Sequence, residues 1–494
     1  MATPRIRISV PTAPSRARHQ TLVVPQTIDG GKFPKASAQF GKAAADLLGK
    51  LEARSRVGVM DQSLAGSGSY DRVAVLSLGP GDKLDGEAAR GAGGSLLKWA
   101  TDLAVKRITV AVDPLFDGLG VDGVGALCEG LWLGDFRFDH HRRTTDKPPP
   151  LIVELVSHRA AARRRIAGRV KTAQHVSAAV NLARELAHEP ANVINPVTLA
   201  ARAKRLAARA RLKCRVLDEP RMRKLKMGAM LAVGQGSTSG SRLIVLEHTG
   251  SGRGKPVVLV GKAITFDTGG YSLKPPDGMV GMKYDKCGGM AVLAAMQAIA
   301  ALKIKTPVVG IIAAAENMVS SRAYRPNDII RAMSGKTVEI ISTDAEGRLV
   351  LADALTYAQK HYKPRAIADL ATLTGGVRVA LGTCCAGLMS NNDALCDALI
   401  AAGTRTHERL WRLPLWDDYR ELIKGDDSDI KNSGGRAAHC ITGGIFLKEF
   451  VDDAVPWAHL DIASVADVDK PGPYCPKGAT GFGVRLLLDY VQNL

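Results

Sequence analysis

Short apolar runs alternate with longer helical patterns along the whole chain of 494 residues. Runs rich in β-branched residues predict strands at 6–10, 22–25, 73–78, 108–112, 151–155, 257–260, 308–313, 338–341, 366–370 and 459–462. Helical spacing of apolar positions predicts helices at 88–103, 124–133, 170–187, 289–302, 348–361 and 393–403. Strands that alternate with helices indicate a parallel or mixed sheet with helices on both faces.

The helical stretch at 170–187 separates two blocks of this pattern and ends at Glu189-Pro190, where a proline stops a helix. The chain is longer than the size at which a single core stops growing, so we expect two domains. The sequence therefore predicts an α/β fold with three parts: a small N-terminal α/β domain at 1–155, a connecting helix within 156–190, and a larger domain at 191–494. The larger domain is expected to hold a mixed, doubly wound sheet covered by helices.

The composition indicates in which cellular compartment the protein is expected. No apolar run approaches the ~20 residues that a helix needs to span a bilayer, so no membrane partner is expected. The eight cysteines form no CxxC pair, which favours a reducing compartment and a cytoplasmic location. Residues 1–25 contain four Arg and no acid, as an organellar transit peptide does. The alternation at 6–10 equally suits an edge strand, and we favour that interpretation.

The formal net charge of +19 is concentrated in one zone. Between 159 and 226 there are 18 Lys and Arg against four acids. Such a zone can bind phosphate backbones, so a DNA-binding architectural or regulatory protein is one hypothesis for this chain. The other interpretation is a solvated helical face, which the interleaved Ala and Leu favour. The zone has no aromatic residues to stack on bases, which weakens a single-strand interpretation.

Charged side chains also gather in loops at the ends of apolar runs. They are Lys262, Asp267, Lys274, Asp285, Asp344, Glu346 and Arg348. The first two follow the predicted strand 257–260, and the pair at 344 and 346 follows 338–341, so both pairs are expected at carboxyl ends of sheet strands, where α/β sheets bind ligands. Four converging carboxylates cannot all stay ionised without cations between them. Two divalent metal ions with shared ligands are the simplest solution.

The motifs that carry these residues, taken in order, resemble the leucine aminopeptidases of the two-metal cytosolic type. The resemblance is dense from about residue 178 to the end of the chain. Its main segments are Gly-Lys-Ala-Ile-Thr-Phe-Asp-Thr-Gly-Gly at 261–270, Ser-Leu-Lys at 272–274, Met-Lys-Tyr-Asp at 282–285, Ser-Thr-Asp-Ala-Glu-Gly-Arg-Leu at 342–349, Ala-Thr-Leu-Thr-Gly at 371–375 and Trp-Ala-His-Leu-Asp at 457–461.

The resemblance implies a role for each residue. Asp267, Asp344 and Glu346 would hold one ion, and Lys262, Asp267, Asp285 and Glu346 the other, the ions being Mn²⁺ or Zn²⁺. Lys274 would donate to the substrate carbonyl, and Arg348 would hold a bicarbonate that acts as general base. The implied activity is release of N-terminal amino acids from peptides, with a leucine-type preference, by a homohexamer. None of these residues is missing, which argues against a pure binding protein, and the roles of Lys274 and Arg348 disfavour a two-metal phosphatase.

Overall fold

The computed structural model describes residues 5–13, 20–29, 40–65, 70–143 and 147–494. The chain divides into two compact units, Met1–Ala178 with Lys470–Lys477, and Ala179–Asp469 with Gly478–Leu494. Part of the stretch discussed as a transit peptide, 1–4 and 14–19, lies outside the described residues. Among the described residues, no helix is both long enough and apolar enough to cross a membrane.

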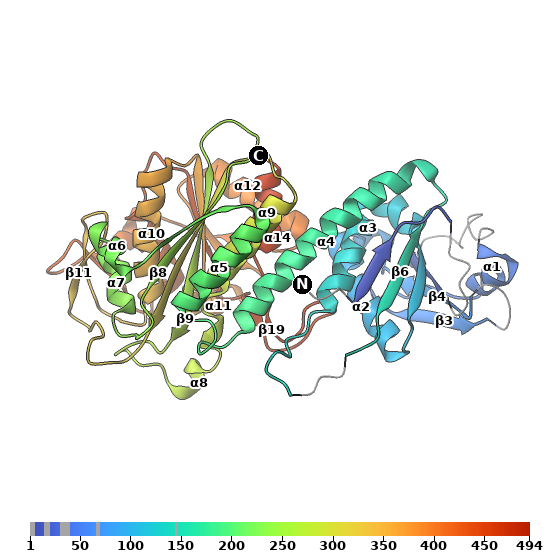
Figure 1. Ribbon diagram of the computed structural model, residues 1–494, viewed down its shortest axis with the longest axis horizontal. Helices are drawn as coiled ribbons and strands as arrows, with labels where there is room; N and C mark the ends of the chain where they lie inside the picture. Colours follow the sequence, from blue (N-terminus) through green and yellow to red (C-terminus); the bar gives the residue numbers. More distant parts are fainter. Residues whose placement is uncertain (1–4, 14–19, 30–39, 66–69, 144–146) are drawn as a thin grey trace. The chain divides into compact units, whose positions relative to one another are not determined.

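The first unit contains one six-stranded sheet and its helices (Figure 1). Its elements are β1 (Ile6–Ser9), β2 (Thr21–Gln26), α1 (Lys42–Leu48), β3 (Met60–Leu64), β4 (Arg72–Ser77), α2 (Gly86–Asp102), β5 (Arg107–Ala111), α3 (Asp113–Gly134), β6 (Leu151–Val156) and the first part of α4 (Ala160–His188). The strand order is β1-β6-β5-β2-β4-β3, parallel except for the β3–β4 pair. The edge strand predicted at 6–10 is confirmed, because β1 lies at one end of this order.

Side chains of the inner strands of this unit, β2, β4, β5 and β6, are buried on both faces of the sheet. On β2, Val23 joins a core with residues of α2, α3 and α4, whereas Leu22 and Val24 join a smaller core with α1. Successive side chains of a strand point to opposite faces, so a strand covered on both sides needs an unbroken apolar run. That requirement explains why β2, β4, β5 and β6 have nearly continuous apolar runs, whereas the edge strand β1 alternates.

The second unit is built on an eight-stranded mixed sheet. Its larger elements are α5 (Pro196–Ala210), β7 (Lys213–Leu217), α6 (Glu219–Lys224), α7 (Gly228–Gly234), β8 (Arg242–His248), β9 (Val257–Asp267), α9 (Cys287–Ala301), β10 (Val308–Asn317), α10 (Glu346–Tyr362), β13 (Ala366–Ala371), β14 (Ala386–Ser390), α12 (Asp393–Thr406), α13 (His439–Lys448), β17 (Trp457–Asp461) and α14 (Val484–Gln492). The smaller ones are α8 (Pro276–Met279), β11 (Ile329–Arg331), β12 (Thr337–Glu339), α11 (Gly375–Leu381), β15 (Leu410–Arg412), β16 (Ile430–Lys431), β18 (Asp467–Val468) and β19 (Gly478–Ala479).

The strand order of this sheet is β15-β14-β17-β13-β9-β10-β8-β7. The central strands β17, β13, β9 and β10 run parallel, and the β14–β17, β10–β8 and β8–β7 pairs are antiparallel. The predicted mixed α/β fold is confirmed. Because β9 and β10 are parallel neighbours, their carboxyl ends meet at the same edge of the sheet.

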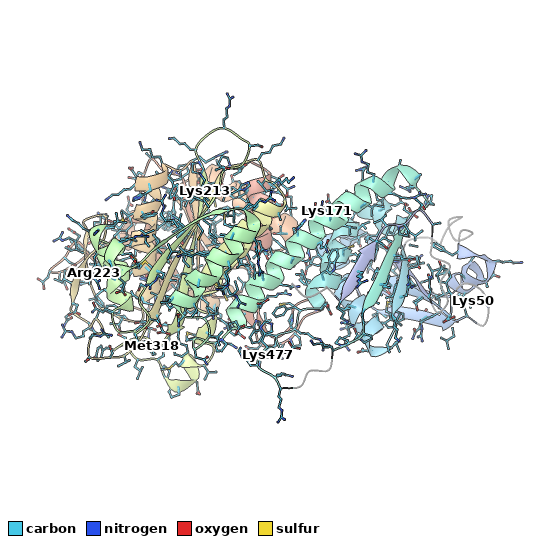
Figure 2. The ribbon with its side chains drawn as sticks, viewed as in Figure 1. Lys50, Lys171, Lys213, Arg223, Met318 and Lys477 are labelled. Carbon is cyan, nitrogen blue, oxygen red and sulfur yellow. The ribbon has the colours of Figure 1, made fainter. Side chains whose placement is uncertain are left out.

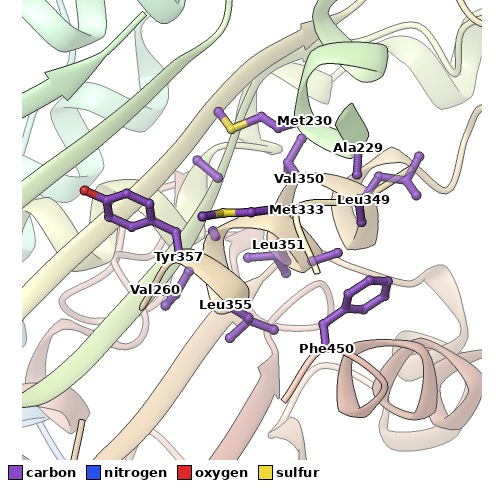
Figure 3. Close-up of a cluster of buried hydrophobic side chains, with 14 of the residues drawn as sticks. Ala229, Met230, Val260, Met333, Leu349, Val350, Leu351, Leu355, Tyr357 and Phe450 are labelled. Carbon is purple, nitrogen blue, oxygen red and sulfur yellow. The ribbon is translucent and has the colours of Figure 1, made fainter. Parts of the chain in front are cut away.

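One face of this sheet is covered by α7, α10 and α13. Figure 3 shows the resulting core, in which Val260 of β9 lies among side chains of α10 such as Leu351 and Leu355. Fixed packing of this kind sets the position of α10 on the sheet. The first residue of α10 is Glu346, so the core also determines where that carboxylate lies.

Two expectations about strands are wrong. The strand predicted at 257–260 continues to Asp267, so Lys262 lies in the interior of β9, and Asp267 is its last residue, at the carboxyl end. The strand predicted at 338–341 is β12, which belongs to a separate three-stranded sheet with β11 and β16. Asp344 and Glu346 therefore do not follow a strand of the main sheet. Lys262 can lie inside a buried strand because the carboxylates of Asp285 and Glu346 compensate its charge.

Candidate active site

Lys262 lies at the centre of the predicted cluster, in the interior of β9. Its Nζ is 2.8 Å from Oδ1 of Asp285, 2.8 Å from Oε1 of Glu346 and 2.8 Å from the carbonyl oxygen of Thr372. The residue is 2% exposed. A buried ammonium of this kind is tolerated only when it is paired and hydrogen-bonded, and here three acceptors surround it.

Lys274 occupies the other side of the cluster. Its Nζ is 2.9 Å from Oδ2 of Asp267 and also donates to Oδ1 of Asp344. The oxygens of Asp267, Asp344 and Glu346 lie within 4.8 Å of one another. The structure therefore brings together all four predicted carboxylates and both predicted lysines, which come from segments up to about eighty residues apart in the sequence.

The electrostatics of the cluster depend on burial. Burial raises the pKa of the Glu346 carboxyl above its ordinary value, and nearby Asp267 raises it further against the opposing effect of Lys262. Burial also raises the pKa values of Asp285 and Asp344. Burial alone would lower the pKa of Lys262, but the surrounding carboxylates outweigh it and the pKa is raised. Without a metal ion, Lys262 is a cation among acids that hold protons more tightly than usual.

Asn317 supports the cluster, and the sequence analysis missed it. It is the last residue of β10, opposite Asp267 in the parallel β9–β10 ladder. Its Nδ2 donates to Oδ1 of Asp267 at 2.8 Å and to the carbonyl oxygen of Thr343 at 2.9 Å. The signal in the sequence was a polar residue at the end of a long apolar strand, the same signal that marked Asp267.

Two further hydrogen bonds hold the carboxylates of Asp285 and Asp267 in place. Oγ1 of Thr372 donates to Oδ1 of Asp285 at 2.6 Å, and the backbone N–H of Gly269 donates to Oδ1 of Asp267 at 2.8 Å. The second oxygen of Asp285 is buried and has no hydrogen-bond partner among the described residues. A buried carboxylate oxygen without a partner is costly, and a cation is the ligand that would satisfy it.

Arg348 lies on α10, one helical position after Gly347, and is 1% exposed. Its Nη1 donates to the carbonyl oxygen of Asn432 at 2.8 Å, while its Nε has no partner among the described residues. Burial lowers the pKa of Arg348 to about 10, against the opposing effect of Glu346 and Asp461. A buried guanidinium with an unused N–H is suited to hold a small anion.

Four carboxylates and two lysines gathered beside the carboxyl ends of parallel strands suit a metal-dependent hydrolase. Comparison with known proteins narrows this class. The catalytic domain of the cytosol aminopeptidase family matches residues 181–488. A probable cytosol aminopeptidase of Geobacter sulfurreducens is 44% identical over 429 residues, which cover 85% of each chain. That of Cenarchaeum symbiosum is 43% identical, with 86% of each chain covered.

Solved structures of similar fold agree with the match to the cytosol aminopeptidase family. The bottromycin maturation enzyme BotP in complex with Mn is 31% identical, with a TM-score of 0.83 over 96% of this chain and 99% of that one. A mutant of tomato leucine aminopeptidase is 30% identical, with a TM-score of 0.85 over 100% of this chain and 97% of that one. The chain belongs to the cytosol aminopeptidase family and is a metal-dependent aminopeptidase.

The basic zone at 159–226 lies on α4, α5, β7 and α6 (Figure 2 labels Lys171, Lys213 and Arg223). Many of its cations, among them Arg164 and Arg165, are exposed. Neither the family match nor these relatives support DNA binding by this zone. DNA binding stays a prediction that nothing here tests.

Proposed function

We propose that the aminopeptidase site holds two divalent cations, one on Asp267, Asp344 and Glu346, and one on Lys262, Asp267, Asp285 and Glu346. The observation that carries this proposal is that the oxygens of the first three residues lie within 4.8 Å of one another. Hard carboxylate oxygens at this spacing suit Mn²⁺ or Zn²⁺, and the unpartnered Oδ2 of Asp285 offers a further ligand atom.

Lys262 binds a cation only as a neutral amine. In the structure its ammonium lies 2.8 Å from each of two carboxylates. It therefore neutralises negative charge that bound metal ions would otherwise neutralise. Adjacent dications would lower its pKa and release this proton. When bound, the two ions would polarise the scissile carbonyl and lower the pKa of a water molecule.

The chain's own groups orient the peptide. Lys274 donates to the substrate carbonyl oxygen and to the negative charge that develops on it. The free α-amine of the substrate binds beside Asp285, which restricts cleavage to the N-terminal residue. Arg348 would hold a bicarbonate ion, which would supply a general base beside the attacking water. The unused Nε–H of Arg348 supports this assignment.

The test is hydrolysis of leucine p-nitroanilide before and after dialysis against a chelator. Activity should disappear with the metal and return with Mn²⁺ or Zn²⁺, because the acidic site is readily refilled. Bicarbonate-free buffer should lower activity in the wild type and have no effect in Arg348→Ala. Full activity in protein shown to be metal-free by elemental analysis would contradict the proposal.

The remaining features are proposals from family resemblance. They include a leucine-type preference, a homohexamer and a cytoplasmic location, the last supported by the name cytosol aminopeptidase given to the relatives. We also propose domain limits of 1–155, 156–190 and 191–494, with peptide hydrolysis in the last part, which the family match at 181–488 supports. Light scattering of the purified chain tests the hexamer, and a fragment that begins at 191 tests the limits.

A further inference from the structure

The second unit contains a cavity of about 800 Å³ that is lined with basic residues. Five lining residues are cationic and none is Asp or Glu: Arg253, Lys255, Lys303, Lys305 and Arg365. They lie just before the first residues of β9, β10 and β13, so the cavity opens at the amino ends of these parallel strands. The proposed metal ligands lie further along the same sheet. Lys262, the nearest of them on β9, is five residues from Val257, about 16 Å at the rise of a strand.

The positive charge of this cavity is larger than the negative charge that the surrounding structure supplies. Helix α9 ends at Ala301 and α14 ends at Gln492, both next to lining residues, and each helix C-terminus carries about half a negative charge. The two helix ends together offset about one of the five charges, so about four positive charges are left over. Among the described residues, none of the five side chains forms an ion pair. All five residues are exposed, so solvent and salt screen their repulsion, and the remaining positive potential of the cavity attracts anions.

We propose that this cavity binds a small anion with two or three phosphate groups. Such an anion carries about the charge that is left over. The cavity volume is in the range of small-molecule sites, roughly 300–1,000 Å³. Arg253 and Arg365 offer paired N–H groups that match phosphate oxygens, and the lysines act as point charges. Gly254 also lines the cavity, and a β-carbon there would meet no atom within 4 Å, so an anion can approach its backbone closely.

Calorimetric titration of the metal-loaded enzyme with pyrophosphate and with ATP, at about 50 mM salt, tests the proposal. We expect saturable binding that weakens as salt rises, because the cations are exposed and screened. The double variant R253A/K305A should weaken binding at least tenfold. The control R209A/K213A removes two exposed cations of the same unit outside the cavity and should bind like the wild type. Peptidase activity should be unchanged in both.

The two probes separate the possible sources of phosphate. Equal affinity for both would mean that the phosphate chain alone is recognised, whereas at least tenfold tighter binding of ATP would identify a nucleotide. No binding of either probe at about 1 mM would overturn the proposal. Binding that persists in R253A/K305A would also overturn it, because the anion would then lie elsewhere, for example on the metal ions.

Discussion

Gly347 offers a direct test of how the position of Lys262 controls the metal site. This glycine is the second residue of α10, between Glu346 and Arg348. A β-carbon at Gly347 would lie 2.6 Å from Nζ, 2.7 Å from Cε and 2.8 Å from Cδ of Lys262. Ordinary contacts of this type lie between 3.4 and 4 Å, and contacts under 3.0 Å essentially do not occur. In Gly347→Ala the Lys262 side chain must therefore move by about 0.8 Å, or α10 must shift.

The displacement separates Lys262 from its partners. Its Nζ contacts Asp285 and Glu346 at 2.8 Å each, so a shift of this size disturbs two proposed ligands of the same ion. Misplacement by about 1 Å near reacting groups can cost roughly 10²-fold in rate. We expect Gly347→Ala to weaken binding of one of the two ions at least tenfold and to lower kcat by 10- to 100-fold. The fold should persist, because alanine favours a helix over glycine by about 1 kcal/mol.

Metal titration followed by calorimetry, elemental analysis and thermal unfolding measure these effects. The matched control is Gly168→Ala in α4, where an added β-carbon meets no atom within 4 Å. It should keep both metal affinities and kcat, and its Tm should stay the same or rise slightly. If Gly347→Ala binds both ions with wild-type affinity and keeps kcat within twofold, the inferred dependence of the metal site on Lys262 is wrong.

Three further predictions address the same cluster. Lys274→Ala should lower kcat by roughly 10²–10³-fold with metal content unchanged, because a donor to the developing oxyanion is lost. Lys262→Ala should instead lose one metal ion. Equal metal loss from the two variants in elemental analysis would refute this division of roles. Asn317→Ala should weaken the metal affinity of Asp267, because a 2.8 Å hydrogen bond to its Oδ1 is removed. The control Asn391→Ala removes an amide that bonds the backbone of Val455 and Trp457, and it should leave metal affinity unchanged. Metal binding near pH 7 should release protons, since the raised pKa values of Lys262 and Glu346 mean that the metal-free site retains protons that the ions must displace. Affinity should therefore rise with pH, about tenfold per unit for each proton released, and calorimetry in buffers of different ionisation enthalpy that detects no proton release would contradict this.

The sequence by itself determined the chemical inventory of the site. The seven charged residues predicted a site for two divalent ions, and the resemblance of the motifs that carry them to leucine aminopeptidases predicted the peptidase activity. The alternating pattern also determined the α/β class, since only strands covered on both faces need continuous apolar runs such as 257–260 and 308–313. These features are local, and local features can be read along the chain.

Only the tertiary structure decided which groups touch. Lys262 contacts Glu346, 84 positions away, because the packing of α10 on β9 holds the start of that helix over the strand. Lys274 contacts Asp267 and Asp344, and Asn317 reaches Asp267 only because β9 and β10 are parallel neighbours. The sequence placed Asp344 and Glu346 after a strand of the main sheet, and this was wrong because β12 pairs with β11 and β16 instead. Strand order and helix packing arise from contacts between distant segments, and no local pattern contains them.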